Sequence, residues 1–393
     1  MNKKKYLFIS MIFTLIAAWS ILLVSGYQKT DLSANTGQNI NAKEWLSDKI
    51  YVAVEDEGVV AVIDADKREV IKKINLSDGG VSYMAHNVQV APDGQSVWVT
   101  GNAMAMSKEH SLRIVPVARA SEGYGHTDVV DGDQDQVIII DPKTDIIVKR
   151  IPMGSDLHLA HVVLTPDNSY AIVDSQTEGE FYKINARTFE IERTVVAPLA
   201  SEPHGLRISP DGKTAYIAMI KGRSIGILDV DNFTAKYVPL DGAAVQTGVT
   251  PDGKYAVASV YDTKKLAVYD IQNEKLSYVA LPQNAKGPVQ VYPSPDSRFV
   301  YVVDQGFYFD QPTGDTVYKI DLMKMEVVKA IKVGDGPHGV VVAKDGRYAY
   351  ITNIVSGDVS VIDIALDEEV AKIKVGDKLN GISVWSRTLG GTQ

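Results

Sequence analysis

The feature that most constrains the fold is a short phrase that the chain repeats six times. Each copy joins two apolar runs through a turn of the Pro-Asp-Gly type. The copies are "VQVAPDGQSVWVT" at Val88, "VVLTPDNSYAIVD" at Val162, "LRISPDGKTAYIA" at Leu206, "TGVTPDGKYAVAS" at Thr247, "VYPSPDSRFVYVV" at Val291 and "VVVAKDGRYAYIT" at Val340. In such a turn proline presets φ, aspartate accepts a backbone N–H and glycine takes a positive φ. Most copies lie a little over 40 residues apart, a period that is typical of repeat folds.

Two further runs complete each unit. A third run ends in aspartate or asparagine, as in "VIIIDPKTD", and a fourth follows it, as in "EVAKIKVG". Four short strands per unit predict a β-propeller blade. Residues 50–76 supply the second, third and fourth strands of a blade without its first strand. Residues 380–386 supply a first strand that no further strands follow. We therefore predict an all-β, seven-bladed β-propeller whose ring is closed by N- and C-terminal strands, which removes exposed sheet edges.

Three phrases make a family resemblance specific. They are "SPDG" at Ser209, "PHG" at Pro337 and "YAYITN" at Tyr348. Over residues 48–386 the chain resembles the YVTN-repeat family of bacterial and archaeal seven-bladed propellers. The resemblance implies the same fold, but propellers serve unrelated functions.

The N-terminal residues indicate targeting. Three lysines, Lys3 to Lys5, precede an apolar stretch of about twenty residues, as in the charged and apolar regions of a secretory signal. Residues 1–26 are predicted to be a signal peptide, cleaved near the small residues of "VSG", or an uncleaved signal anchor, because the apolar stretch is long. Residues 27–47 indicate a polar linker, residues 48–386 the propeller and residues 387–393 a tail. We expect export across a membrane, and membrane contact only through the N-terminal segment if it is uncleaved.

Composition excludes several classes of site. The 393 residues contain no cysteine, which excludes disulfides, Cys-ligated iron–sulfur clusters, covalent c-type haem attachment and a thiol nucleophile. The net charge of −9 argues against a nucleic-acid partner, because phosphate binding needs clustered Lys and Arg. We find no catalytic motif on the chain.

Three histidines occupy one equivalent position just before a first strand. When the copies are aligned on their turns, these are His86, His204 and His338, and the other blades place Ala160, Val245, Val289 and Asn380 there. One hypothesis is that they bind copper, zinc or a d-type haem at the mouth of the central channel, because imidazole is the commonest metal ligand. The alternative is structural: each ring donates to a carbonyl of a neighbouring blade. Since non-adjacent blades supply them, we expect these three histidines to be spread around the channel.

Two strand connections are longer than the rest. About thirty extra residues, roughly 102–135, follow the second strand of the first complete blade. Residues 304–316 lengthen the same connection, between the second and third strands, in the fifth complete blade. The first contains alternating aspartates, Asp128, Asp131, Asp133 and Asp135. They suggest a calcium site, although Gln136 and Pro142 stand where an EF-hand has Gly and Glu. The alternative is a solvated acidic loop.

The second expansion carries three consecutive aromatic residues, Phe307, Tyr308 and Phe309. Three adjacent aromatic side chains are too many for a free turn. We interpret them as a candidate partner-binding site, with packing against the chain's own insertion as the alternative.

The overall pattern also resembles the β subunits of the hydrazine synthases of anammox bacteria. This resemblance implies an exported propeller subunit of a multi-haem redox complex, in a periplasm-like compartment or the anammoxosome lumen, that takes part in nitrogen metabolism. It implies a subunit that is non-catalytic by itself, carries no cofactor and docks haem-bearing subunits in a hetero-oligomer. Two alternatives stay open: a propeller enzyme with its own metal or d-type haem, and a cell-surface adhesion or lactonase-type propeller.

Overall fold

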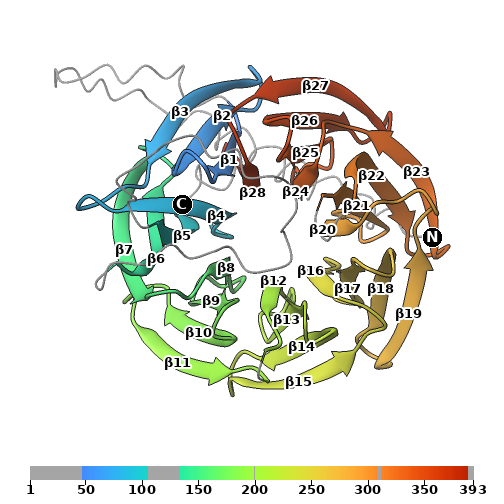
Figure 1. The fold of residues 1–393 in the computed structure, drawn as a ribbon, viewed down its shortest axis with the longest axis horizontal. Coiled ribbons are helices and arrows are strands. Elements are labelled where there is room, and N and C mark those ends of the chain that lie inside the picture. The colour runs from blue at the N-terminus through green and yellow to red at the C-terminus, as the bar shows by residue number, and fades with distance from the viewer. Residues whose placement is uncertain (1–46, 105–132, 199, 308–310, 388–393) are drawn as a thin grey trace, which may run out of the picture. The chain divides into compact units, whose positions relative to one another are not determined.

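The computed structural model describes residues 47–104, 133–198, 200–307 and 311–387. These residues form a ring of seven four-stranded antiparallel sheets, the blades, around a central channel (Figure 1). The prediction of an all-β, seven-bladed β-propeller is therefore confirmed. All seven blades lie in the compact unit Trp45–Gln393. Among the residues described, no helix has the length and apolar character needed to span a membrane.

Each blade is named here after its innermost strand. From the channel outward, the closing blade consists of β28 (Leu379–Trp385), β1 (Lys49–Val54), β2 (Val59–Asp64) and β3 (Glu69–Asn75). The next three blades are β4 (Ser82–Val90), β5 (Val97–Met104), β6 (Asp135–Asp141) and β7 (Ile146–Gly154); β8 (Leu159–Leu164), β9 (Tyr170–Ser175), β10 (Glu180–Asn185) and β11 (Ile191–Val196); and β12 (Pro203–Ile208), β13 (Thr214–Met219), β14 (Ser224–Asp229) and β15 (Thr234–Pro239). The last three are β16 (Ala244–Val249), β17 (Tyr255–Val260), β18 (Lys265–Asp270) and β19 (Lys275–Ala280); β20 (Pro288–Pro293), β21 (Phe299–Gly306), β22 (Thr313–Asp321) and β23 (Glu326–Lys332); and β24 (Pro337–Val342), β25 (Tyr348–Asn353), β26 (Asp358–Asp363) and β27 (Glu368–Lys374).

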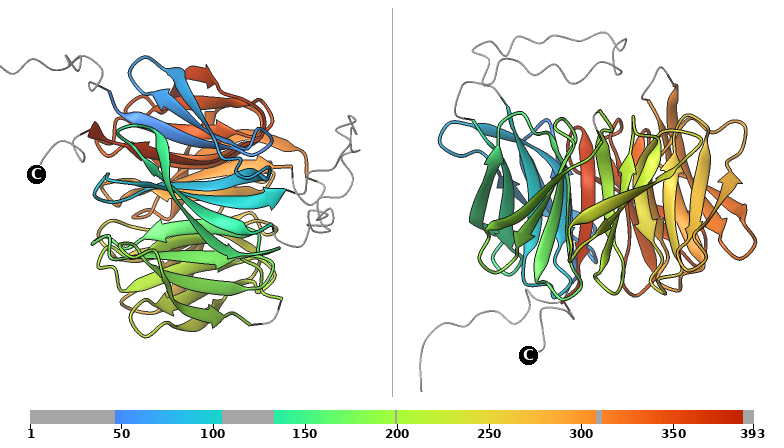
Figure 2. Two further views of the ribbon diagram at one scale, coloured as in Figure 1. Left: turned by 90° about the vertical axis from the view of Figure 1, so that its left-hand side faces the viewer. Right: turned by 90° about the horizontal axis from the view of Figure 1, so that it is seen from below.

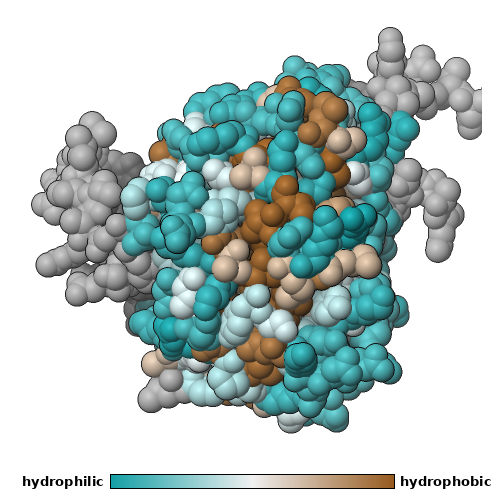
Figure 3. All heavy atoms as spheres, turned by 90° about the vertical axis from the view of Figure 1, so that its right-hand side faces the viewer, coloured by the Kyte–Doolittle hydropathy of each residue, from teal (hydrophilic) through white to brown (hydrophobic). Residues whose placement is uncertain are grey.

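Burial decreases from the channel to the rim. Every residue of β8 and of β24 is buried, whereas β11 is exposed along most of its length. The inner strands are largely buried on both faces because each blade packs between two neighbours. On one side of the ring, where β19 and β23 lie, apolar residues form a band framed by hydrophilic ones (Figure 3).

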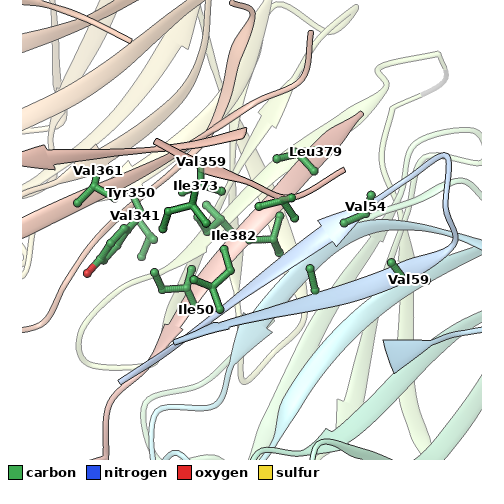
Figure 4. Close-up of a cluster of buried hydrophobic side chains, with 14 of the residues drawn as sticks. Ile50, Val54, Val59, Val341, Tyr350, Val359, Val361, Ile373, Leu379 and Ile382 are labelled. Atoms are coloured by element: carbon green, nitrogen blue, oxygen red, sulfur yellow. The ribbon is translucent and has the colours of Figure 1, made fainter. Parts of the chain in front are cut away.

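The two ends of the described chain meet in the closing blade. Strand β28 pairs antiparallel with β1, so that Ile50 lies opposite Val384 and Val52 opposite Ile382. Leu379 and Ile382 enter a core cluster shared with the β24 blade (Figure 4). The predicted closure by N- and C-terminal strands is confirmed.

Every innermost strand carries a register shift of the β-bulge type near its start. In β4 it lies between Ala85 and Val88, in β12 between Pro203 and Leu206, and the other five blades repeat it. A bulge leaves residues unpaired and re-aims their side chains. The first bulged residue of each blade is the position that the sequence alignment identified as equivalent.

Side chains of the second strands hold these bulges in place. The N–H of the second bulged residue donates to Thr100 in the β4 blade, to Asp174 in the β8 blade, to Ser259 in the β16 blade and to Thr352 in the β24 blade. A buried N–H without a partner would be destabilising, so these acceptors fix where the bulged side chains point.

The longer connections lie where they were predicted, between second and third strands. The first joins β5 to β6, and residues 105–132 of it lie outside the described residues. The second is largely strand, because β21 and β22 pair as far as Gly306 opposite Thr313. Both connections lie beside the starts of innermost strands, since Ser82 pairs with Met104 and Pro288 with Asp304. We call this side the channel-mouth face; strands run between it and the opposite face (Figure 2).

Candidate functional site

Five histidines gather where the innermost strands converge. Four of them, His86, His161, His204 and His338, are bulged residues of β4, β8, β12 and β24, and His158 lies just before β8. All five side chains are buried. The ring centroids of His86 and His204 are 5.7 Å apart, those of His161 and His204 are 5.3 Å apart, and those of His86 and His158 are 5.3 Å apart. These five residues are called the channel cluster below.

The expectation that His86, His204 and His338 are spread around the channel is wrong for the first two. His86 and His204 belong to blades separated by the β8 blade, yet their rings are neighbours. The reason is that seven innermost strands converge on one narrow axis, and bulged side chains point toward it. The intervening blade contributes His161 to the same group.

The three equivalent histidines all use Nδ1 for a hydrogen bond. Nδ1 of His86 lies 2.8 Å from a Glu55 carboxylate oxygen, and Nδ1 of His338 lies 2.5 Å from the Gln305 amide oxygen. Nδ1 of His204 lies 2.9 Å from the carbonyl of Val245 in the neighbouring blade. The structural prediction of bonding to a neighbouring carbonyl therefore describes His204, whereas the other two are bonded to side chains.

The acceptors Glu55 and Gln305 were not identified from the sequence. Glu55 directly follows β1, and Gln305 is the last residue but one of β21. Each lies one residue past the partner of the first strand's start, and each contacts the histidine of the next blade in the chain. Asn380 reinforces the first pair, because its amide donates to Glu55 over 2.5 Å. A polar residue at this position, one blade before a bulged histidine, is the signal that could have identified them.

Burial makes four histidines of the cluster, His86, His161, His204 and His338, neutral at ordinary pH. Desolvation lowers the pKa of His86 and of His338 to about 4, and that of His204 to about 3. The pKa of His161 is also lowered, first by burial and then by the neighbouring imidazoles. Burial raises the pKa of the Glu55 carboxyl. A neutral imidazole carries one ring proton and one ring lone pair, which is the form that binds metals.

The described side chains do not form a complete metal centre. Within the described residues, no three His, Asp or Glu side chains have their ligand atoms close enough together to hold a metal ion. The buried nitrogens Nε2 of His86, Nε2 of His338 and Nδ1 of His161 nonetheless have no hydrogen-bond partner among the described residues. The site thus offers several unused, neutral imidazole nitrogens in one buried place.

The predicted calcium ligands do not form one described group. Asp128 and Asp131 lie outside the described residues. Asp135 braces the base of the insertion: its carboxylate accepts from the N–H of Ala103 at 2.7 Å, of Leu157 at 2.9 Å and of His158 at 3.0 Å. The calcium site stays a prediction.

The predicted partner-binding aromatics are only partly described. Tyr308 and Phe309 lie outside the described residues, and Phe307 is half-buried at the end of β21 with φ of 68°. Asp304 holds the same region by accepting from the N–H groups of Lys286 and Gly287. Partner binding by these aromatics stays a prediction.

Comparison with known proteins identifies a family. Residues 95–308 match the family described as "YNCE-like beta-propeller". The uncharacterized protein YncE of Salmonella typhimurium LT2 is 20% identical over 185 residues, which are 47% of this chain. The chain spans only 41% of that relative's length.

Solved structures share the fold at low sequence identity. A functionally unknown protein from Desulfotomaculum acetoxidans is 16% identical with a TM-score of 0.66, and the match covers 86% of this chain and 99% of that one. Kuenenia stuttgartiensis hydrazine synthase is 17% identical with a TM-score of 0.61, over 85% of this chain and 100% of that one. Virginiamycin B lyase from Staphylococcus aureus is 13% identical with a TM-score of 0.56, over 74% and 84%. At such identities the matches show the fold alone.

Proposed function

We propose, from the premise that this chain belongs to the YNCE-like β-propeller family, that it is an exported subunit of a multi-haem redox complex. In this proposal the chain is non-catalytic by itself and docks haem-bearing subunits through its channel-mouth face. Export rests on the signal-like residues 1–26.

The observation that carries the proposal is that both enlarged strand connections open on the channel-mouth face. Strand β5 runs two residues beyond the six that most second strands have, and β21 does the same. The opposite face has short turns, such as the one in which Thr250 accepts the N–H of Gly253. Loops on a rigid scaffold are where binding residues concentrate, so an asymmetric enlargement favours one docking face.

The likeness to Kuenenia stuttgartiensis hydrazine synthase supports the same proposal. It covers the whole of that chain and most of this one, so a propeller of this size occurs in hydrazine synthase. The absence of cysteine from the sequence means that c-type haems would have to be carried by partner chains.

Affinity purification from the native organism tests the proposal. The full chain, tagged at its C-terminus, should co-purify with polypeptides that carry haem, detected by haem staining and absorption. Replacing residues 105–132 by a short Gly-Ser link should reduce the co-purified haem at least tenfold. Its melting temperature should stay unchanged, because those residues lie outside the four-strand units.

A matched control is Lys254→Glu, a charge reversal on an exposed turn of the opposite face, which should leave co-purification intact. Purification of the chain alone would contradict the proposal. Full retention of haem subunits by the shortened chain would contradict the docking face. A lone chain with lactone-opening activity would favour the lactonase-type alternative instead.

A further inference from the structure

Four members of the channel cluster, His86, His161, His204 and His338, each have one ring nitrogen outside the hydrogen bonds described above. Nε2 of His86, Nε2 of His338 and Nδ1 of His161 are buried and have no partner among the described residues. In His204 the single proton of the neutral ring lies on Nδ1, which donates to Val245, so its Nε2 carries the lone pair. Leaving a buried polar nitrogen unpaired costs about 1–3 kcal/mol, so the three unpaired nitrogens of His86, His161 and His338 in one place indicate a missing ligand.

In His204 and His338 the partner of Nδ1 fixes which ring nitrogen is free. An amide oxygen and a backbone carbonyl can only accept, so Nδ1 of His338 and of His204 must donate to them, whereas Nδ1 of His86 lies between the Glu55 carboxyl at 2.8 Å and the Asn380 amide nitrogen at 3.1 Å. The same arrangement recurs around metal-bound histidines, in which one ring N–H donates to a carboxylate or carbonyl and the other nitrogen binds the metal. Here the carbonyl is that of Val245, beside His204.

The ring spacings are close to those of imidazoles that share one ion. For metal–nitrogen distances of about 2 Å and tetrahedral angles, two ring centroids lie about 5 Å apart. The measured spacings are 5.7 Å for His86 and His204 and 5.3 Å for His161 and His204. The spacing of these two pairs of rings is therefore compatible with a shared ion.

We propose that His86, His161, His204 and His338 bind one transition-metal ion on the channel axis, of the class that prefers imidazole ligands, copper or zinc. Imidazole suits these ions, and neither thiolate nor an all-oxygen shell is present in the cluster. The carboxyl groups of Glu55, against His86, and Asp174, against the backbone of His161, lie next to the site. This inference concerns the isolated chain and does not depend on partner subunits.

Metal titration of the purified full chain tests the proposal. After chelator treatment, Cu²⁺ and Zn²⁺ are added separately, excess ion is removed, and bound metal is measured by elemental mass spectrometry. We expect one ion of copper or zinc per chain and, for the copper form, electron paramagnetic resonance coupling to imidazole nitrogen. His86→Ala and His204→Ala should each weaken binding about 100-fold or more.

The matched control is the double variant His110→Ala with His126→Ala, which removes the two histidines that lie outside the described residues. This variant should bind metal like the unaltered chain. Melting curves of the metal-free variants show whether they fold. If the variants do not fold, metal binding by the unaltered chain still tests the proposal. Uptake far below one ion per chain, or a copper spectrum without nitrogen coupling, overturns it. Unchanged binding by folded His86→Ala and His204→Ala variants also overturns it.

Discussion

At the scale of the residue, the aspartate of the repeated turn holds the local backbone. Asp211 accepts from the Ser209 hydroxyl at 2.5 Å and from the Lys213 N–H at 3.1 Å. Asp167 makes the corresponding bonds to Thr165 and Ser169. The hydroxyl and N–H donors lower the pKa of both carboxyls. The recurring aspartate is therefore explained by the turn, as its position in the sequence predicted.

Asp211→Ala should lower the free energy of unfolding by about 1 kcal/mol at pH 7, the usual net worth of such hydrogen bonds. Because the folded-state pKa of Asp211 is lowered, its contribution is present above the ordinary carboxyl pKa of about 4 and is lost as the pH falls through the folded value. Urea denaturation measured from pH 7 to pH 3 should show that the difference in free energy of unfolding between the variant and the unaltered chain becomes smaller as the pH falls. Asp231→Ala, at an exposed turn, serves as control, and a gap that stays constant with pH would contradict this account.

The histidines show how much of the candidate site can be predicted from sequence at this scale. Alignment on the turns identified the equivalence of His86, His204 and His338, because all are first bulged residues of innermost strands. It did not identify Glu55 or Gln305, since contacts between blades depend on how two units pack and not on the repeat itself. For the same reason it did not place His86 beside His204.

At the scale of the element, β28 joins the two ends of the ring. It carries Leu379, which is fully buried, and Trp385, whose indole N–H donates to the carbonyl of Gly94 at 2.8 Å. The Ser383 hydroxyl accepts from the N–H of Val90 in the next blade at 3.0 Å. One short strand therefore connects the closing blade to the β4 blade, while Leu379 packs in the cluster shared with the β24 blade.

Deleting residues 378–393 should destabilise the whole ring, because it exposes the edge of β1 and removes Leu379 and Ile382 from their cluster. The milder change Leu379→Ala should cost about 2–5 kcal/mol, as for other buried leucines. Calorimetry of the melting transition measures both. Deleting only residues 388–393, which follow β28, is the control and should leave the melting temperature unchanged. Equal melting of the longer deletion and the unaltered chain would refute closure by β28.

The sequence predicted the strands more accurately than the connections. The four-strand period and the shared closing blade follow from a pattern that each unit repeats, so local rules were sufficient. The expansion at residues 304–316 was expected as a loop, whereas β21 and β22 continue through much of it to the pairing of Gly306 with Thr313. Whether two strands stay paired across a connection depends on the residues of both strands, and the sequence of one strand alone does not show it.

At the scale of the whole molecule, seven blades bring their bulged residues to one axis. This convergence places side chains from distant parts of the sequence together, such as Glu55, His86 and Asn380. It also places the enlarged connections and the starts of the innermost strands on one face. The ring can therefore combine a docking face with a buried binding site at the channel.

Anomalous X-ray diffraction from crystals of the full chain loaded with copper or zinc would show directly whether the channel binds a metal ion. Data collected on either side of the absorption edge of the bound metal locate the ion without reference to any protein coordinates. We expect one strong anomalous peak on the channel axis, bounded by the ring nitrogens of His86, His161, His204 and His338. A channel without a peak in metal-loaded crystals, or a peak only at surface carboxylates, would contradict it.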